Sequence, residues 1–190
     1  NVPLEQQKEI NLAFDMETDG LDSTRIHCIV TQDLDTGLVE EYNDEKYSDN
    51  PKDLPMASNS ITSGLNSLMA CDNIVSHNGI AYDVAQAQKH YPFFRKLMAK
   101  HWDTLILSRF YHPNLLDIDL KRRWRDMPAK LYGSHSLEAY GYRLRCRKGE
   151  FGQTTDWKNW TPEMQEYCKQ DVVVLTKLWD HFQKYLNPSS

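Results

Sequence analysis

The sequence predicts an α/β fold in which helices flank a mixed β-sheet. Three short apolar or alternating segments come first, separated by turns rich in Asp, Gly and Thr. Strand-like and helix-like segments then alternate, and a long amphipathic segment closes the chain. This order is typical of a mixed sheet with helices packed on it. A length of 190 residues suits a single domain, which is expected to span residues 1–190.

The individual elements follow from hydrophobic periodicity and from the residues that interrupt it. Strands are predicted at 11–15, 26–32, 38–42 and 73–76, with the first three side by side in an antiparallel meander. Helices are predicted at 61–70, 82–90 and 136–142, and a further apolar segment covers 102–111. The final helix is expected to begin at Thr161-Pro162-Glu163, which offers a capping hydroxyl and a first-turn proline. The polar stretches 44–60 and 145–159 are expected to be loops.

Charge is divided unevenly along the chain, whose net charge is −5. Between Phe93 and Lys148 there are 13 Lys and Arg against five Asp and Glu, a net charge of +8. The rest of the chain carries nine basic and 22 acidic residues, a net charge of −13. The basic runs at 121–125 and 143–148 could hold a phosphate backbone, and each could equally be a solvated surface.

Membrane and disulfide-rich classes do not fit the sequence. No stretch approaches the roughly 20 apolar residues that cross a bilayer, and the first residues, NVPLEQQKEI, lack the build of a signal peptide. We therefore expect a cytoplasmic protein with no membrane partner. The cysteines lack the paired short spacings of a zinc site or disulfide framework and are expected to be reduced thiols: Cys28, Cys71, Cys146 and Cys168.

Two carboxylates share one face of the first predicted strand. If the strand continues through Glu17, its period of two puts Asp15 and Glu17 on one face and Phe14 and Met16 on the other. Like charges this close repel, so a cation between them would stabilise the pair, and Mg²⁺ prefers oxygen ligands. Acidic residues at strand ends are also common on solvated surfaces, so the pair alone is a weak indication of a metal site.

A third carboxylate interrupts the apolar stripe of the final helix. Apolar residues recur at helical spacing from Met164 to Phe182, and Asp171 falls on the same face. Burying an unpaired carboxylate is costly, so Asp171 is expected to meet a cation or to be protonated. Tyr167 lies one turn earlier, which brings its hydroxyl near this carboxylate. The alternative is that Asp171 pairs with an arginine of the basic segment and Tyr167 is a core residue.

The fourth carboxylate, Asp83, follows a predicted strand and begins a predicted helix. An acid in the first turn of a helix is favoured by the helix dipole, so its position alone proves little. Asn78 and His77 would line the same loop. We expect His77 to be structural and Gly79 to serve a turn conformation.

Together these segments resemble the three motifs of the DEDD (DnaQ-like) exonuclease superfamily, which has an RNase H-like fold and includes the proofreading domains of DNA polymerases. The pattern D-x-E-T is met by residues 15–18, N-x-x-x-[FY]-D by 78–83 and Y-x-x-x-D by 167–171. The sister class has a histidine where this chain has Glu166, so the resemblance is to the tyrosine class, DEDDy.

Finer similarity is to the proofreading domains of family A DNA polymerases from short-tailed bacteriophages. Segments such as IHCIV, HNGIAYD, DTLILSR, GSHSLEAYGYRL and YCKQDVVV carry it over nearly the whole chain. The loop between Gly149 and Trp160 is shorter than expected of that group, and no polymerase sequence follows the final helix. The resemblance therefore implies a polymerase fragment or a free-standing relative, monomeric and, if phage-encoded, in the host cytoplasm.

The resemblance also implies a reaction and a set of catalytic residues. The chain would be a 3′-5′ exonuclease that releases nucleoside 5′-monophosphates from single-stranded or frayed 3′ ends of DNA. Two divalent cations, Mg²⁺ or Mn²⁺, about 4 Å apart would activate water and stabilise the leaving oxygen. Asp15, Glu17 and Asp171 would hold one cation, while Asp15 and, largely through water, Asp83 would hold the other. Tyr167 and Glu17 would orient the water.

By the same resemblance, four residues would contact the substrate. Thr18 and Asn78 would meet the terminal sugar. Leu21 would be an apolar wedge beside the terminal base, and Tyr82 would pack or stack next to it. For Leu21 the alternative is a turn residue that returns to the core.

Two other functions share these motifs. An exonuclease similar to RNase D would trim RNA with the same carboxylates. An inactive relative would only bind nucleic acid, although such a protein is expected to lose ligands and all four are present here.

Overall fold

Five strands form one mixed sheet in the computed structural model, which describes residues 8–45, 59–147 and 157–189. The strand order is β3-β2-β1-β4-β5. β1 pairs antiparallel with β2 and parallel with β4, β2 pairs antiparallel with β3, and β4 pairs parallel with β5. The predicted mixed sheet is confirmed, with these bounds: β1 Asn11–Thr18, β2 Ile26–Asp33, β3 Val39–Asn43, β4 Asn73–Ser76 and β5 Lys100–Asp103.

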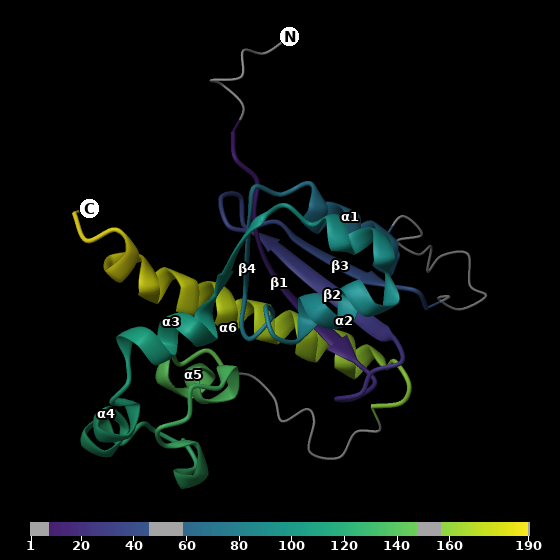
Figure 1. The fold of residues 1–190 in the computed structure, drawn as a ribbon. Helices are drawn as coiled ribbons and strands as arrows, with labels where there is room; N and C mark the ends of the chain where they lie inside the picture. Colours follow the sequence, from purple (N-terminus) through teal and green to yellow (C-terminus); the bar gives the residue numbers. More distant parts are fainter. Residues whose placement is uncertain (1–7, 46–58, 148–156, 190) are drawn as a thin grey trace.

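Helices cover both faces of this sheet (Figure 1). One face packs against α1 (Ile61–Met69), α2 (Asp83–His90) and the 3₁₀ helix η2 (Pro92–Lys96). The long α6 (Pro162–Leu186) crosses the opposite face. Successive residues of β1 point to opposite faces of the sheet. Phe14 packs in the core beside α1, and Ala13 packs against α6.

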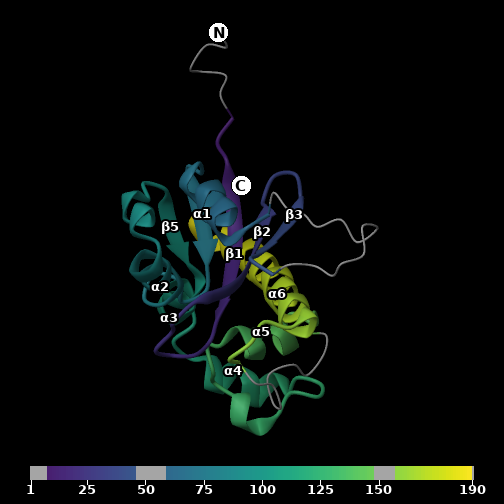
Figure 2. The same ribbon diagram turned by 90° about the vertical axis from the view of Figure 1, so that its right-hand side faces the viewer.

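The segment between β5 and α6 forms a smaller group of helices, which lies below the sheet in both views (Figures 1 and 2). It contains α3 (Thr104–Tyr111), α4 (Leu115–Arg122), the 3₁₀ helix η3 (Ala129–Leu131) and α5 (Leu137–Arg143). We call residues 115–143 the α4–α5 lobe. Leu115 and Tyr140 of the lobe pack against Leu178 and Phe182 in the C-terminal half of α6.

A buried ion pair holds the α4–α5 lobe together. Arg143 donates from Nε and from a terminal nitrogen to the two carboxylate oxygens of Asp119, at 3.0 and 2.7 Å. The same carboxylate accepts from the Trp124 indole at 2.7 Å and from the Gly133 amide at 2.8 Å. Burial alone would raise the pKa of Asp119, but these hydrogen bonds outweigh it and lower the pKa. Asp119 therefore stays ionised as the centre of the lobe.

The structure departs from the predicted elements in two ways. The segment 102–111 divides between β5 and α3, because the Asp103 side chain accepts from the Leu105 amide at 2.9 Å and caps the helix. α4 and the two 3₁₀ helices were not predicted. Most of the predicted loops 44–60 and 145–159 lies outside the described residues. Over the described ranges, no helix combines the length and apolarity needed to cross a bilayer.

Gly79 lies in a turn, as expected, although its backbone does not adopt the left-handed conformation that favours glycine. Instead, a Cβ at this position would lie 2.1 Å from the Ser76 Oγ, so the chain passes too close to β4 for a side chain.

Replacing Asp119 by Ala is expected to destabilise the protein by about 3–5 kcal/mol, because it leaves the Arg143 guanidinium buried without its carboxylate. The side chains of Arg143 and Asp119 are only 5% and 0% exposed. Urea denaturation of the variant measures the loss. Asp117→Ala removes an exposed carboxylate from the same helix and serves as the control. Equal denaturation midpoints for the two variants would contradict a stabilising role for the ion pair.

Candidate active site

β1 and α6 bring three of the predicted carboxylates together. Asp15 and Glu17 lie near the C-terminal end of β1, and Asp171 lies on α6 where that helix crosses the strand. The carboxyls of Glu17 and Asp171 lie close enough to Asp15 for their charges to raise its pKa. The Cys168 thiol, one turn before Asp171, donates to the Asp15 backbone oxygen at 3.4 Å. This contact fixes the close approach of the helix to the strand.

The fourth carboxylate, Asp83, reaches the same cluster from α2. β4 runs parallel to β1, so the chain leaves β4 at the end of the sheet where Asp15 and Glu17 lie. Asp83 is the first residue of α2 and is buried. Its charge raises the pKa of both Asp15 and Glu17, which places its carboxylate next to the two acids of β1. All four predicted carboxylates therefore converge at one end of the sheet.

The cluster is electrostatically unfavourable when it holds only carboxylates. Burial is the largest cause that raises the pKa of Asp15 and Glu17 well above their usual values, and repulsion between the acids adds to it. Burial likewise raises the pKa of Asp83 and of Asp171 to about 7, with further contributions from Asp103 for the first and from Glu138 for the second. Without a cation, the four groups cannot all be ionised at neutral pH.

The donor atoms present fit a hard divalent cation. Asp15 Oδ2 and Asp83 Oδ2 are both buried without a hydrogen-bond partner, which is costly unless a cation takes the place of the missing donor. The four carboxylates supply the oxygen ligands that Mg²⁺ and Mn²⁺ prefer.

Cys168 adds a sulfur atom to this site, which sequence reasoning did not anticipate. Ligand atoms of Asp15, Glu17 and Cys168 all lie within 4.8 Å of one another. Burial raises the pKa of the Cys168 thiol well above its usual value, so it remains protonated and donates to backbone. The oxygen atoms are therefore the better ligands. All four cysteines are free thiols, as predicted.

Tyr167 lies beside the cluster, as the helical spacing predicted. Burial raises the pKa of its hydroxyl, and the negative charges of Asp171, Glu17 and Asp15 raise it further. The hydroxyl therefore stays protonated and can donate a hydrogen bond. Its ring packs edge-on against Trp157, with 6.4 Å between the ring centroids.

The alternative for Asp171 was an ion pair with an arginine of the basic segment. Arg147 is close enough to lower the pKa of Asp171, but Glu138 raises it by more. These two residues also pair with each other, at 2.8 Å. Within the described residues, no ion pair joins Asp171 to an arginine, and its charge acts on Asp15 within the acidic cluster.

The turn after β1 is fixed by the predicted residues Thr18 and Tyr82. The Thr18 hydroxyl donates to the Gly20 backbone oxygen at 3.1 Å and lies 2.8 Å from the Tyr82 hydroxyl. Tyr82 donates to the same oxygen at 2.6 Å. Leu21, at the tip of this turn, is 90% exposed, so the alternative that it returns to the core is wrong.

A buried carboxylate that was not predicted, Asp103, shapes the loop that carries Asn78. Asn78 adopts a left-handed backbone with φ of 63°, and its amide donates to Asp103 at 2.8 Å. The Ile80 amide donates to the other oxygen at 3.4 Å. The signal in the sequence was an Asp directly before the apolar run 104–107, which is a helix-cap pattern. His77 contacts Thr104 and the His135 backbone and is structural, as expected.

Comparison with known proteins places this fold in a family. The family described as the RNase_H superfamily matches residues 12–183. The chain is 32% identical over 191 residues to a DNA-directed DNA polymerase of Enterobacteria phage T3, covering 88% of this chain and 26% of that protein. It is 38% identical over 126 residues to a DNA-directed DNA polymerase of Escherichia phage T7, covering 55% of this chain and 18% of that protein.

Two solved structures share the fold at 13% identity. The family B DNA polymerase from the hyperthermophilic archaeon Pyrobaculum calidifontis superimposes with a TM-score of 0.58, over 95% of this chain and 25% of that one. The Aedes aegypti Nibbler EXO domain also gives a TM-score of 0.58, over 95% of this chain and 81% of that one. At this identity, the likeness concerns the fold.

The family match extends across the mixed sheet and α6, the elements that carry the four carboxylates. The predicted RNase H-like fold is confirmed, as is the resemblance to DnaQ-like exonucleases of the phage polymerase type. The family and the polymerase relatives support a nuclease. The chain belongs to the RNase_H superfamily.

Proposed function

We propose that this chain is a 3′-5′ exonuclease that removes nucleotides from single-stranded or frayed 3′ ends of DNA with two divalent cations. The observation that carries the proposal is the convergence of Asp15, Glu17, Asp83 and Asp171 with two buried oxygens lacking partners. The similarity to phage DNA polymerases favours a proofreading domain, acting as part of a polymerase or as a free-standing relative.

The four carboxylates would be shared between the two cations according to their positions in the cluster. Asp15 and Asp171, whose charges interact across the crossing of β1 and α6, would hold one cation with Glu17. Asp83, on the α2 side, would hold the second with Asp15. When bound, the cations would supply an activated water and stabilise the charge on the leaving oxygen.

The remaining residues would position the substrate and the water. The protonated Tyr167 hydroxyl can donate to the attacking water or to a phosphate oxygen, while Glu17 can accept from the water. Leu21 projects from a turn that Thr18 and Tyr82 hold in place, so it can press against the terminal base. Asn78 lies on the exposed loop at the end of β4 and can reach the terminal sugar.

Digestion of a 5′-labelled primer with a mismatched 3′ end tests this function. With Mg²⁺, the chain is expected to release nucleoside 5′-monophosphates from the mismatched end faster than from a blunt duplex. Asp171→Ala, or Asp15→Ala, should reduce the rate by more than about 100-fold. Loss of a residue that only hydrogen-bonds a metal ligand costs about 10–100-fold, and each of these variants removes a ligand itself. Asp180→Ala, an exposed acid on the same helix, should retain the rate.

Three results would contradict the proposal. Preference for an RNA of the same sequence would favour an RNA-trimming enzyme similar to RNase D. Wild-type protein that binds the primer without releasing nucleotides, whether EDTA or Mg²⁺ is present, would favour an inactive binding module. Mg²⁺-dependent release by an Asp15→Ala/Asp171→Ala double variant would remove the cluster from the reaction.

Tyr167→Phe should slow hydrolysis by about tenfold or less, because it removes one orienting hydrogen bond and no cation ligand. The Mg²⁺ concentration that gives half-maximal activity should be unchanged, which distinguishes this variant from loss of a ligand. Measuring the rate against Mg²⁺ concentration checks both expectations. Wild-type rates in this variant would exclude the hydroxyl from catalysis.

Stability should depend on pH in opposite ways with and without a cation. The pKa values of Asp83 and Asp171 are raised to about 7, so the folded state holds their protons more tightly than the unfolded state does. Their contribution to stability is fully present below about pH 4 and is lost as the pH rises through about 7. A divalent cation binds the ionised carboxylates and restores this stability.

Thermal melts in EDTA and in Mn²⁺ measure this dependence. We expect the Tm in EDTA to fall between about pH 5 and pH 8, and the rise caused by Mn²⁺ to be larger at about pH 8 than at about pH 6. Asp171→Ala should weaken both effects. A Tm that is insensitive to Mn²⁺ across this range would argue against a cation site.

A further inference from the structure

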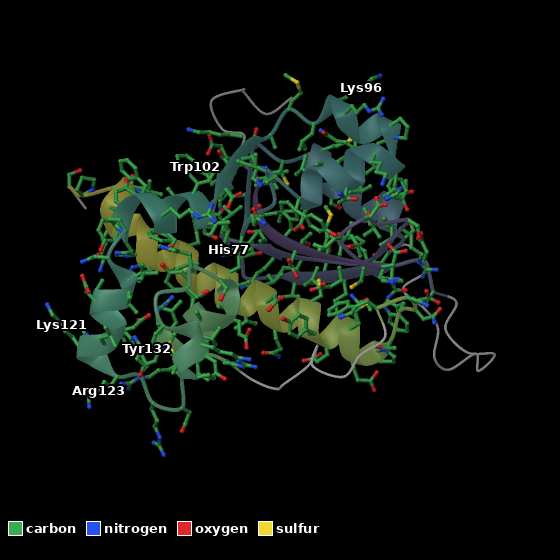
Figure 3. The ribbon with its side chains drawn as sticks, turned by 60° about the horizontal axis from the view of Figure 1, so that its bottom comes forward. His77, Lys96, Trp102, Lys121, Arg123 and Tyr132 are labelled. Carbon is green, nitrogen blue, oxygen red and sulfur yellow. The ribbon has the colours of Figure 1, made fainter. Side chains whose placement is uncertain are left out.

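A basic hollow opens beside the α4–α5 lobe, outside the acidic cluster. It encloses about 880 Å³, near the upper end of the roughly 300–1,000 Å³ of ligand sites. We call it the arginine hollow. Arg123 marks it in Figure 3, where this residue projects from the end of α4. Its lining combines five arginines with two aromatic rings and a single acid: Arg122, Arg123, Trp124, Arg125, Asp126, Gly141, Tyr142, Arg145 and Arg147.

Arginine and aromatic side chains are stacked at two places in the hollow. The Arg122 guanidinium lies 5.6 Å from the centre of the Trp124 ring. The Arg147 guanidinium lies 4.7 Å from the centre of the Tyr142 ring and donates to its hydroxyl at 2.7 Å. Trp124 is itself anchored from below by its hydrogen bond to Asp119. The hollow therefore offers flat surfaces that are held in place before any ligand binds.

The backbone of the hollow has an uncommon conformation at three residues. Arg123, Asp126 and Arg145 adopt left-handed conformations, with φ of 48°, 60° and 55°. Within the described ranges, Asn78 of the carboxylate site is the only other non-glycine residue with positive φ. Arg123 and Arg145 lie just after the ends of α4 and α5, where a left-handed residue is common, and all three residues line the hollow.

The hollow lies next to the helix that carries Asp171. Arg147, which lines it, pairs with Glu138 of α5 at 2.8 Å, and α5 packs against α6. Arg147 packs directly on α5, since a Cβ on Gly141 would lie 3.2 Å from its Cβ. A polymer whose end lies at Asp171 would therefore have basic side chains along its next segment.

We propose that the arginine hollow binds the nucleotides that precede the 3′ terminus of single-stranded DNA. This inference rests on the proposed function, because it takes the terminal nucleotide to lie at the carboxylates. Arginine guanidinium groups match phosphate oxygens in a bidentate way, and the aromatic and guanidinium planes accept bases of any sequence by stacking. An acidic peptide would use the charges but not the aromatic faces.

Binding in EDTA tests the hollow separately from hydrolysis. The probe is a 5′-fluorescein single strand of about 12 nucleotides, within the roughly 4–16 nucleotides of single-strand sites, measured by fluorescence anisotropy. The test variant is Arg123→Asn/Arg145→Asn, since Asn tolerates the left-handed backbone at both positions. We expect its Kd to rise about tenfold and the slope of log Kd against log salt to fall by about 1.4.

The control variant is Arg95→Asn/Lys96→Asn, which removes two exposed charges from η2. Lys96 lies at the opposite end of the molecule from Arg123 (Figure 3). The control should bind within about twofold of wild type, because charges beyond the screening length contribute little. Equal losses in the test and control variants would overturn the proposal, as would a polyglutamate peptide that competes as well as a single strand of the same charge.

Hydrolysis separates failure of this inference from failure of the proposed function. The test variant should lose about tenfold in kcat/KM on the longer strand, mostly through KM, and should match wild type on a dinucleotide that cannot reach the hollow. Equal losses of kcat/KM on both substrates would overturn the proposal that the hollow binds DNA, while the proposed exonuclease function would stand. A wild-type chain that binds DNA through these arginines but releases no nucleotide would overturn the proposed function alone.

Discussion

Repulsion among four carboxylates is the constraint to which the rest of the site responds. Asp15, Glu17, Asp83 and Asp171 come from three separate elements, and each has a raised pKa because burial and its neighbours oppose ionisation. Apolar packing of α6 on β1 holds the acids together despite this cost, with the Cys168 contact at the crossing point. A divalent cation between two carboxylates would be attracted to both of them, and these two attractions would outweigh the repulsion between the carboxylates.

The surroundings of the cluster are built to keep its geometry. Asp103 caps α3 and accepts the amides of the loop that precedes Asp83, so the second motif is held by a residue outside it. In the α4–α5 lobe, Asp119 and Arg143 form a second buried centre that fixes the arginine-rich surface next to Asp171. Acidic and basic groups are thereby separated in space, which is why a net charge of −5 is compatible with a polyanionic substrate.

Much of this arrangement could be predicted from local pattern, and the remainder depended on tertiary contacts. Strand period placed Asp15 and Glu17 on one face of β1, which the structure shows packed against α6, and helical spacing placed Tyr167 beside Asp171. The turn at Gly79 was predicted, but the close approach of Ser76, which leaves no room for a side chain there, could not be read from the sequence. The sequence analysis did not predict α4. The helix is short, and its buried residue Asp119 is held by partners as far as 24 positions away in the sequence. Long-range hydrogen bonds of this kind leave no periodic signal in sequence.

The central claim is that these carboxylates jointly hold divalent cations, and anomalous X-ray scattering from crystals grown with Mn²⁺ tests it most directly. Two manganese peaks should lie within ligand distance of the carboxylate oxygens, one between β1 and α6 and the other toward Asp83. Crystals in which the four carboxylates lie together but bind no manganese would contradict the account.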